Sequence, residues 1–299
     1  MKIAVMGAGA VGGYCGALLA RAGHDVCLIA RPAHVEAINA RGGLRLDSKA
    51  FSGVVPLAAT SDPAAVASAD LVLVVVKSTD TETAAGQMAP HLSATTPVLS
   101  LQNGVDNAKR LGALLGRAVI PAAVYVASEV AGPGHIRHLG RGELILGPSD
   151  HSDALARLFS DAAIPATVSA AVREALWQKL TINCAYNALS AIPRLNYARM
   201  FAVEGTAEVM RAVVGECVAV AAARGIRLPD DMLAQTLALH ESMPAQQSST
   251  AQDFARGRPS EINHLNGTIV RAGRELGIPT PANLTLLTLV KLCEAAMTA

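Results

Sequence analysis

The feature that most constrains the fold is a glycine motif near the start of the chain. Gly7-Ala8-Gly9-Ala10-Val11-Gly12 follows a short apolar run at 3–6 and opens a helical pattern over 11–22. A G-x-G-x-x-G motif between a strand and a helix is typical of the first turn of a dinucleotide-binding βαβ unit. Gly7 permits the tight turn, Gly9 lets a pyrophosphate approach the backbone, and Gly12 lets helix and strand pack closely. An ordinary glycine-rich turn is the alternative interpretation.

The residue after the second predicted strand bears on the choice of nucleotide. The strand at 25–29 runs into Ala30 and Arg31, where NAD-selective sites usually carry an acid that bonds the ribose 2′-hydroxyl. A guanidinium at this position can pair with a 2′-phosphate through charge-assisted hydrogen bonds. The sequence therefore favours NADP over NAD, although a solvated loop arginine would give the same pattern.

Two continuous apolar runs, at 71–76 and 98–101, flank a helical stretch over 79–91. Such runs are typical of strands buried on both faces of a parallel sheet. After residue 118, shorter segments punctuated by glycine follow at 119–127, 135–138 and 143–146. These segments predict antiparallel strands at one end of the sheet.

Polar residues follow both apolar runs, with Lys77 after the first and Gln102-Asn103-Gly104 after the second. Ligands of open α/β sheets bind outside the carboxyl ends of the strands. Lys77, Gln102 and Asn103 are therefore candidate ligand-binding residues, and Asn103 could bond either a cofactor or a substrate. A simple turn explains the same pattern equally well.

The second half of the chain has a different pattern. From residue 172 onward it consists of long helical stretches with turn signals at Pro193, 225–229 and 277–281. We therefore predict an α/β fold class, with an N-terminal Rossmann-type parallel sheet and an all-α C-terminal domain. The predicted domains are residues 1–170 and 171–299.

A polar stripe interrupts the first helix of this second domain. Lys179, Asn183 and Asn187 are spaced i, i+4, i+8 on an otherwise apolar helix over 173–192, so they lie along one face. Asparagine has a low helix propensity, so two asparagines lower the stability of a helix unless their side chains have another role. The stripe is either part of a site or a solvent-facing face. Hydroxyl, amide and acidic residues also cluster at 248–253 and 261–267, but spacing alone does not bring them to Lys179.

Charge and composition exclude several classes of function. The formal net charge is +1, so no global field attracts nucleic acid or an anionic membrane, and we expect a small-molecule partner. No apolar run is long enough to span a membrane. Glycines interrupt the region that could pass for a signal peptide. The five cysteines lack metal or redox spacing, which fits free thiols in the cytoplasm. The apolar helices of the second domain are compatible with a homodimer.

Taken together, these motifs resemble those of the ketopantoate reductase family, the 2-dehydropantoate 2-reductases, over essentially the whole chain. The matching motifs are the opening G-A-G-A-V-G, Arg31, Lys77, Gln102-Asn103-Gly104, Lys179 to Asn187, Ser248-Ser249, and Glu261-Ile262 with Asn266-Gly267. The resemblance implies an NADP-dependent oxidoreductase that transfers a hydride from NADPH to ketopantoate and forms pantoate, a step toward coenzyme A.

The resemblance also implies roles for single residues. Lys179 would be the general acid that protonates the carbonyl oxygen, and Glu261 would orient or polarise Lys179. An ammonium near that oxygen also stabilises the developing negative charge. The family's substrate-holding positions match Asn103, Asn183, Asn187 and Ser249. The nicotinamide end of the cofactor matches Lys77 and Asn103.

Three departures from the family pattern concern the substrate. Many relatives have Asn-Pro where this chain has Asn187-Ala188, Gln246 stands where an asparagine is expected, and Asn196 is displaced by one position. These changes leave open a second reading, in which the substrate is another branched or aryl 2-oxo acid. A non-catalytic NADPH-sensing module is a third reading, and the presence of both Lys179 and Glu261 argues against it.

Overall fold

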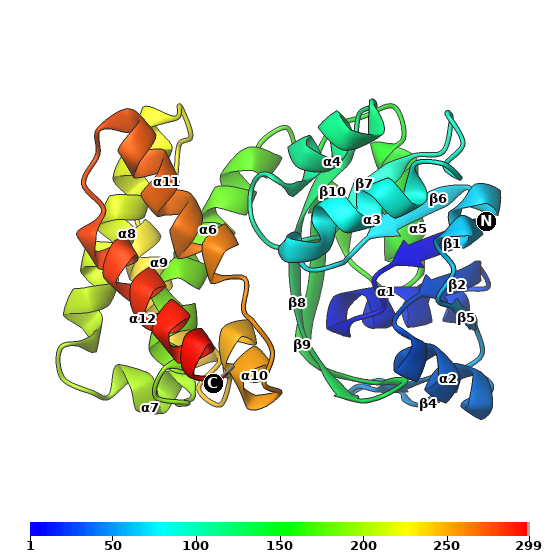
Figure 1. Cartoon of the computed structure of the whole chain (residues 1–299), viewed down its shortest axis with the longest axis horizontal. Coiled ribbons are helices and arrows are strands. Elements are labelled where there is room, and N and C mark those ends of the chain that lie inside the picture. The colour runs from blue at the N-terminus through cyan, green and yellow to red at the C-terminus, as the bar shows by residue number, and fades with distance from the viewer. Residues whose placement is uncertain (298–299) are drawn as a thin grey trace. The chain divides into compact units, whose positions relative to one another are not determined.

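The computed structural model describes residues 1–297, and the chain divides into two compact units, Met1–Val172 and the residues from Arg173 onward. Residues 298 and 299 of the predicted second domain lie outside the described residues. Figure 1 traces both units along the chain.

The first unit is built on one mixed sheet. Its strands are β1 (Lys2–Met6), β2 (Asp25–Ile29), β3 (Leu44–Asp47), β4 (Ser52–Val55), β5 (Ala58–Thr60), β6 (Leu71–Val74), β7 (Val98–Ser100), β8 (Ile120–Gly132), β9 (His135–Leu146) and β10 (Ala166–Val168). The order is β4-β3-β9-β8-β7-β6-β1-β2-β5, with β10 beside β9. The strands from β5 to β8 in this order run parallel. The chain order reverses between β1 and β6, which is the switch point where ligands of such sheets bind.

Helices cover both faces of this sheet. They are α1 (Ala10–Arg21), α2 (Pro32–Arg41), η1 (Pro63–Ser68), η2 (Ser78–Asp80), α3 (Thr81–Met88), α4 (Asn107–Leu115) and α5 (Ser152–Asp161). Alternate residues of β1 point to opposite faces. Ile3 and Val5 lie in one core with α1 and α5, whereas Ala4 and Met6 lie in a second core with α3 and α4. Figure 1 shows α3 and α4 together on one face. The predicted Rossmann-type architecture is thus confirmed.

The strands at the other end of the sheet differ in length from the predicted ones. β8 and β9 form an antiparallel hairpin of 13 and 12 residues, so the antiparallel pairing is confirmed. The segments at 135–138 and 143–146, which we predicted as separate strands, belong to the single strand β9. Register shifts interrupt the pairing near Tyr125 and Ala127. These bulges add residues without ending the strand, which is why glycine punctuation misled the prediction.

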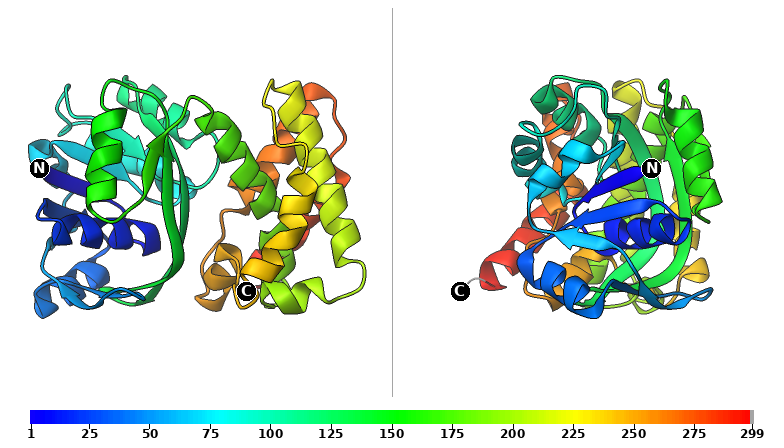
Figure 2. Two further views of the ribbon diagram at one scale, coloured as in Figure 1. Left: turned by 180° about the vertical axis from the view of Figure 1, so that it is seen from behind. Right: turned by 90° about the vertical axis from the view of Figure 1, so that its right-hand side faces the viewer.

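The second unit is helical. Its elements are α6 (Val172–Ala191), α7 (Tyr197–Phe201), α8 (Thr206–Ala223), α9 (Met232–Ser242), α10 (Ser249–Ala255), η3 (Ile262–His264), α11 (Asn266–Leu276) and α12 (Pro281–Met297). Among the described residues from 172 onward there is no strand, so the all-α prediction is confirmed. Figure 2 shows the helices of this unit packed side by side. Within residues 1–297 no helix is both long and apolar enough to cross a membrane.

Candidate functional site

The glycine turn between β1 and α1 has the geometry that the motif predicts. Gly7 has a φ of +105°, which favours glycine, and its amide donates to the carbonyl oxygen of Ile29 at 3.0 Å. A Cβ on Gly7 would lie 2.6 Å from the backbone nitrogen of Val76. A Cβ on Gly12 would lie 2.1 Å from the carbonyl oxygen of Gly7. Both glycines are therefore required by the protein's own packing.

Gly9 differs from these two glycines. A Cβ at this position would meet no protein atom within 4 Å, so the protein's own packing does not require glycine there. Gly9 is the N-cap of α1, no side chain caps this helix end, and its first turn holds no acid. The first backbone amides of a helix carry partial positive charge and bind phosphate. The turn at 7–12 thus fits a pyrophosphate, with Gly9 leaving room for it.

Arg31 is the second residue after β2 and the N-cap of α2. Its Nη2 atom is 3.4 Å from Oδ2 of Asp80, and the two side chains are 75% and 45% exposed. An exposed ion pair of this kind contributes little to stability. The guanidinium is therefore accessible to an anionic ligand.

Lys77 and Asn103 follow neighbouring parallel strands, since β6 pairs with β7 and Val74 lies opposite Ser100. The strand before Lys77 ends at Val74 rather than at the predicted residue 76. Lys77 is half-buried and precedes η2, and Asn103 is also half-buried. The two residues therefore lie at the same edge of the sheet as the glycine turn.

Gln102 has a different environment from the one expected of a cofactor ligand. The residue is buried, and its Nε2 atom donates to the carbonyl oxygen of Val76 at 3.1 Å and to Oγ1 of Thr81 at 2.8 Å. Its Oε1 atom accepts from Ser100 at 3.0 Å. The side chain thus ties the end of β7 to the segment after β6, so any contact of Gln102 with a cofactor would have to come from its backbone.

In the second unit, the polar stripe of α6 becomes more buried along the helix. Lys179 and Asn183 are half-buried, and Asn187 is only 3% exposed. The Nδ2 atom of Asn187 donates to Oγ of Ser249 at 3.2 Å. At Asn187 the stripe therefore does not face solvent. Asn187 and Ser249, two of the predicted substrate residues, lie in contact.

Ser248, next to Ser249, ties the start of α10 to α6. Its Oγ atom donates to the carbonyl oxygen of Asn187 at 3.1 Å and accepts from the amide of Ala251 at 3.1 Å. Its amide donates to Oγ of Ser190 at 3.2 Å. The double serine thus has one residue that anchors the segment and one that contacts Asn187.

The segment that carries Glu261 is anchored by residues on either side of it. Ser260 donates to Oε1 of Glu294 through both its amide (2.7 Å) and its hydroxyl (2.6 Å). Five residues after Glu261, the Nδ2 atom of Asn266 donates to the carbonyl oxygen of Cys184 on α6 at 3.1 Å. These bonds fix the segment that carries Glu261 against α12 and α6.

Asn196 and Gln246, the departures from the family pattern, have local roles. Oδ1 of Asn196 accepts from the amide of Arg199 and caps α7. Nε2 of Gln246 donates to the carbonyl oxygen of Gln247, and its own carbonyl oxygen accepts from the amide of Tyr197 at 2.9 Å.

The described cysteines form no disulfide, and three of them are buried. All five cysteines are free, as predicted. Burial raises the pKa of Cys15 to about 12 and that of Cys184 well above its ordinary value, so neither thiol suits a nucleophile. Residues 1–297 contain no group of three or more His, Cys, Asp or Glu that could hold a metal ion.

Sequence reasoning missed a set of buried polar residues behind Asn103. They are Ser78, Thr81 and Asn107, with the partly exposed Arg110 at the outer edge. The only signal for them in the sequence is the i, i+4 spacing of Asn103 and Asn107 at the start of a helix, which by itself is uninformative.

Two family models match the chain. The model described as ketopantoate reductase PanE/ApbA matches residues 3–151, and the one described as ketopantoate reductase PanE/ApbA C terminal matches residues 171–294. A curated 2-dehydropantoate 2-reductase from Mesorhizobium japonicum is 33% identical over 97% of both chains.

Two solved structures are similar over the whole chain. The PanE/ApbA family ketopantoate reductase from Ralstonia eutropha is 57% identical, with a TM-score of 0.97 and complete coverage of both chains. A D-mandelate dehydrogenase, solved with NADH and anilino(oxo)acetate, is 25% identical, with a TM-score of 0.94 and complete coverage of both chains.

Proposed function

We propose that this chain, which belongs to the ketopantoate reductase family, reduces 2-dehydropantoate to pantoate with NADPH. The family consists of pyridine-nucleotide-dependent oxidoreductases, and the chain is an enzyme of this class. The observation that carries the proposal is the full-length similarity to curated 2-dehydropantoate 2-reductases. The glycine turn at 7–12 offers backbone amides for the cofactor. Lys179, Asn183 and Asn187 offer polar side chains suited to the reaction.

The proposed chemistry is a two-electron reduction of a carbonyl group. Bound NADPH supplies a hydride for carbon 2 of the oxo acid. The ammonium group of Lys179 gives a proton to the carbonyl oxygen, so that oxo acid, NADPH and one proton yield hydroxy acid and NADP⁺. The positive charge of Lys179 stabilises negative charge on that oxygen before the proton arrives. Glu261 orients Lys179, and its own segment is held by the bonds of Ser260 to Glu294.

The remaining candidate residues hold the two ligands. The turn at 7–12 binds the pyrophosphate, with Ala8, Ala10 and Val11 contributing backbone, and Lys77 and Asn103 bind the nicotinamide end. Asn183, Asn187 and Ser249 hold the oxo acid, and Asn103 contributes to its binding. The bond between Asn187 and Ser249 supports a shared role.

NADP is the proposed nucleotide rather than NAD. The support is the exposed guanidinium of Arg31, two residues after the end of β2, where no acid stands to accept a bond from a ribose hydroxyl. The D-mandelate dehydrogenase neighbour was solved with NADH, so NAD is the alternative nucleotide.

The same neighbour favours a second candidate substrate. Anilino(oxo)acetate is an oxo acid with an aromatic group, and the dehydrogenase that holds it has a TM-score of 0.94 to this chain. Gln246 and Asn196 are engaged in local hydrogen bonds at positions where the family pattern expects substrate-binding asparagines. An aryl 2-oxo acid is therefore the alternative substrate.

NADPH oxidation by a panel of oxo acids tests the function. We expect kcat/KM to be highest for 2-dehydropantoate and lower for benzoylformate, an aryl 2-oxo acid. The reverse order would favour the aryl substrate. Tight NADPH binding without turnover of any oxo acid would contradict the proposed activity and point to a sensing role.

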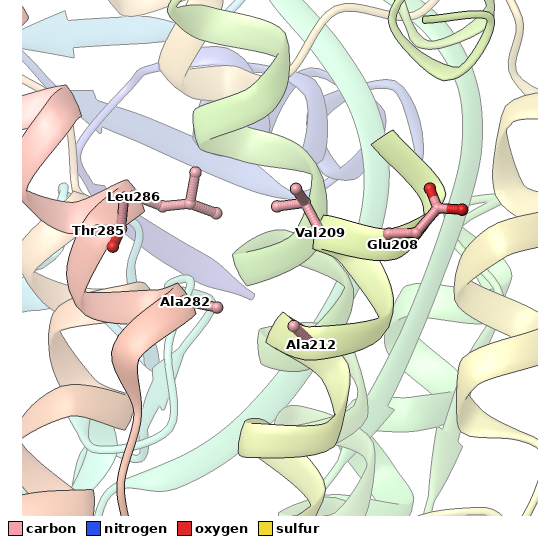
Figure 3. A pocket seen from close by; sticks show the side chains of 6 residues that line it. All are labelled: Glu208, Val209, Ala212, Ala282, Thr285 and Leu286. Atoms are coloured by element: carbon pink, nitrogen blue, oxygen red, sulfur yellow. The ribbon is translucent and has the colours of Figure 1, made fainter. Parts of the chain in front are cut away.

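We also propose that two copies of the chain associate through α8 and α12. Figure 3 shows side chains of these helices facing each other across a largely apolar groove, lined by Glu208, Val209, Ala212, Ala282, Thr285 and Leu286. Large apolar residues farther along α12 are also exposed, with Leu289 at 41% and Leu292 at 61%, and exposed apolar surface often marks an interface. Sedimentation should show a dimer that Leu289→Glu weakens. A monomeric wild-type chain would contradict this association.

The cytoplasm is the proposed location of the enzyme, because its five cysteines are all free, as is usual in a reducing compartment.

A further inference from the structure

The carbonyl oxygen of Asn103 accepts two hydrogen bonds from buried side chains. Oγ of Ser78 donates to it at 3.0 Å, and Nδ2 of Asn107 donates to it as well. Ser78 is completely buried and Asn107 is 4% exposed. Two donors on one carbonyl oxygen, both inside the protein, fix the direction of that carbonyl bond.

These two donors are themselves held. Nδ2 of Asn107 also donates to Oγ of Ser78 at 3.0 Å. Oδ1 of Asn107 accepts from Nη1 of Arg110 at 2.8 Å and from Oγ1 of Thr81 at 3.2 Å. Every hydrogen-bonding position of the Asn107 amide is therefore used, which locks its orientation.

Arg110 closes the outer edge of this polar cluster. Its Nη2 atom donates to the carbonyl oxygen of Ser78 at 3.1 Å and to the carboxylate of Glu82 at 2.6 and 2.7 Å. The cluster thus binds the segment after β6 to the start of α4. It therefore connects the segment after β6, which carries Lys77, with the segment after β7, which carries Asn103.

The fixed carbonyl determines where the next amide points. The peptide bond between Asn103 and Gly104 is planar and trans, as are all peptide bonds of residues 1–297, so its N–H points opposite to its C=O. Because the carbonyl of Asn103 faces the cluster, the amide of Gly104 faces away from it. Gly104 has a φ of +95°, which side-chain-bearing residues rarely adopt.

This amide lies at the ligand-binding edge of the sheet. Gly104 comes after β7, which lies next to β6 in the sheet. The chain after β6 continues to Val76, whose backbone contacts the glycine turn at Gly7. Ligands of open α/β sheets bind at this edge. An amide that is oriented in advance binds an oxygen acceptor without an ordering cost.

We infer that the amide of Gly104 is a fixed hydrogen-bond donor to an oxygen of the nicotinamide half of bound NADPH. Ser78 and Asn107 are positioning residues that hold this donor through the carbonyl of Asn103. The inference rests on the proposed function, because it takes NADPH as the cofactor. It adds a backbone contact and two positioning side chains to the candidate residues at the nicotinamide end.

Two ligands separate this role from a general structural one. NADPH contains both halves of the cofactor, whereas adenosine 2′,5′-bisphosphate carries the adenosine half alone. Calorimetry measures the Kd of each ligand for the wild-type chain, Ser78→Ala and Asn107→Ala. We expect the Kd of NADPH to rise about ten-fold in each variant, while the Kd of the bisphosphate stays the same.

Ser93→Ala is the matched control. It removes a hydroxyl from an exposed residue of the same unit that bonds only the neighbouring Thr95 through its side chain, so both Kd values should equal those of the wild type. Arg110→Gln is a variant at the edge of the cluster. Because Arg110 is 25% exposed, its replacement should disturb folding less than replacement of Ser78 or Asn107. It should weaken NADPH binding about three-fold through the lost bond to Asn107.

Three outcomes would be decisive. Equal weakening of both ligands would overturn the inference, because it would mean a general loss of structure. An unchanged Kd for NADPH in all three variants would overturn it as well. A wild-type chain that binds neither ligand would instead contradict the proposed function, on which the inference depends.

Discussion

At the scale of single residues, the proposed reaction depends most on the ammonium group of Lys179. General acid catalysis by a positioned side chain contributes about 10²–10⁴-fold to a rate. We therefore expect Lys179→Ala to lower kcat by at least about 10²-fold without changing the Kd for NADPH, because the group acts in the transition state. Turnover and equilibrium binding measure the two quantities. The exposed Lys49→Ala should match the wild type, and an unchanged kcat in Lys179→Ala would remove this residue from the mechanism.

Arg31 is the residue that should distinguish the two nucleotides. Its guanidinium pairs with the exposed carboxylate of Asp80 at 3.4 Å, and a doubly charged phosphate can displace such a pair. We expect Arg31→Ala to raise the Kd of NADPH about ten-fold or more and to leave that of NADH nearly unchanged.

Fluorescence titration with both nucleotides measures the effect of this change. Asp80→Asn is the matched control, since it keeps the guanidinium and removes the competing charge, so its Kd for NADPH should not rise. Equal losses for NADPH and NADH in Arg31→Ala would contradict a bond to the 2′-phosphate.

Single residues differ in how far the sequence could predict them. Gly12 is predictable because its requirement is local, since a Cβ there would meet the carbonyl oxygen of Gly7. Gly7 is predictable from the turn that gives it a positive φ, although the backbone of Val76 that also excludes a Cβ is distant in the sequence. Ser78 and Asn107 are not predictable in this way, because their hydrogen bond joins positions 29 residues apart, one after β6 and one at the start of α4. Gln102 was predicted as a cofactor residue from its place after a strand, but its side chain is used within the protein.

At the scale of elements, the neighbouring strands β3, β4 and β9 carry a pH-dependent contact. Asp47 of β3 accepts from Oγ of Ser52 at 2.6 Å, and its other oxygen is 2.6 Å from Nε2 of His135. The hydrogen bond from Ser52, the bond with His135 and the charge of Arg45 lower the pKa of Asp47 from 3.8 to about 2. These partners favour the ionised carboxylate in the folded chain.

The sign of the stability change follows from that shift. A carboxylate whose pKa is lowered by folding stabilises the folded state above its ordinary pKa, and the effect is lost as the pH falls from about 4 to about 2. We expect the Tm of the wild type to fall more steeply over this interval than that of Asp47→Asn. Thermal unfolding at several pH values measures both curves, and parallel curves would contradict the role of Asp47.

The elements themselves were predicted unevenly. The strands before Gly7 and before Asn103 have continuous apolar runs, and the structure confirms them as β1 and β7. The strands β3 and β4 escaped prediction because they are four residues each and half-exposed, which leaves little periodicity to detect. In the second unit, pattern alone could not bring Ser249 to Asn187, since that contact depends on how α10 packs on α6.

At the scale of the whole molecule, the proposed reaction draws its groups from both units. The candidate cofactor residues fall within Met1–Val172, whereas Lys179 and Glu261 belong to the unit from Arg173 onward. The two family models divide the chain in the same way, at 3–151 and 171–294. The central claim is therefore that the chain reduces an oxo acid with a hydride from NADPH, and that Lys179 protonates the oxygen of that acid.

Deuterium transfer tests this claim most directly. The chain is incubated with 2-dehydropantoate and NADPH that carries deuterium at the transferable position of carbon 4, and the product is analysed by mass spectrometry. We predict pantoate with one deuterium at carbon 2 from the wild type, and almost none formed in the same time by Lys179→Ala. Pantoate without deuterium, or no pantoate at all from the wild type, would contradict the claim.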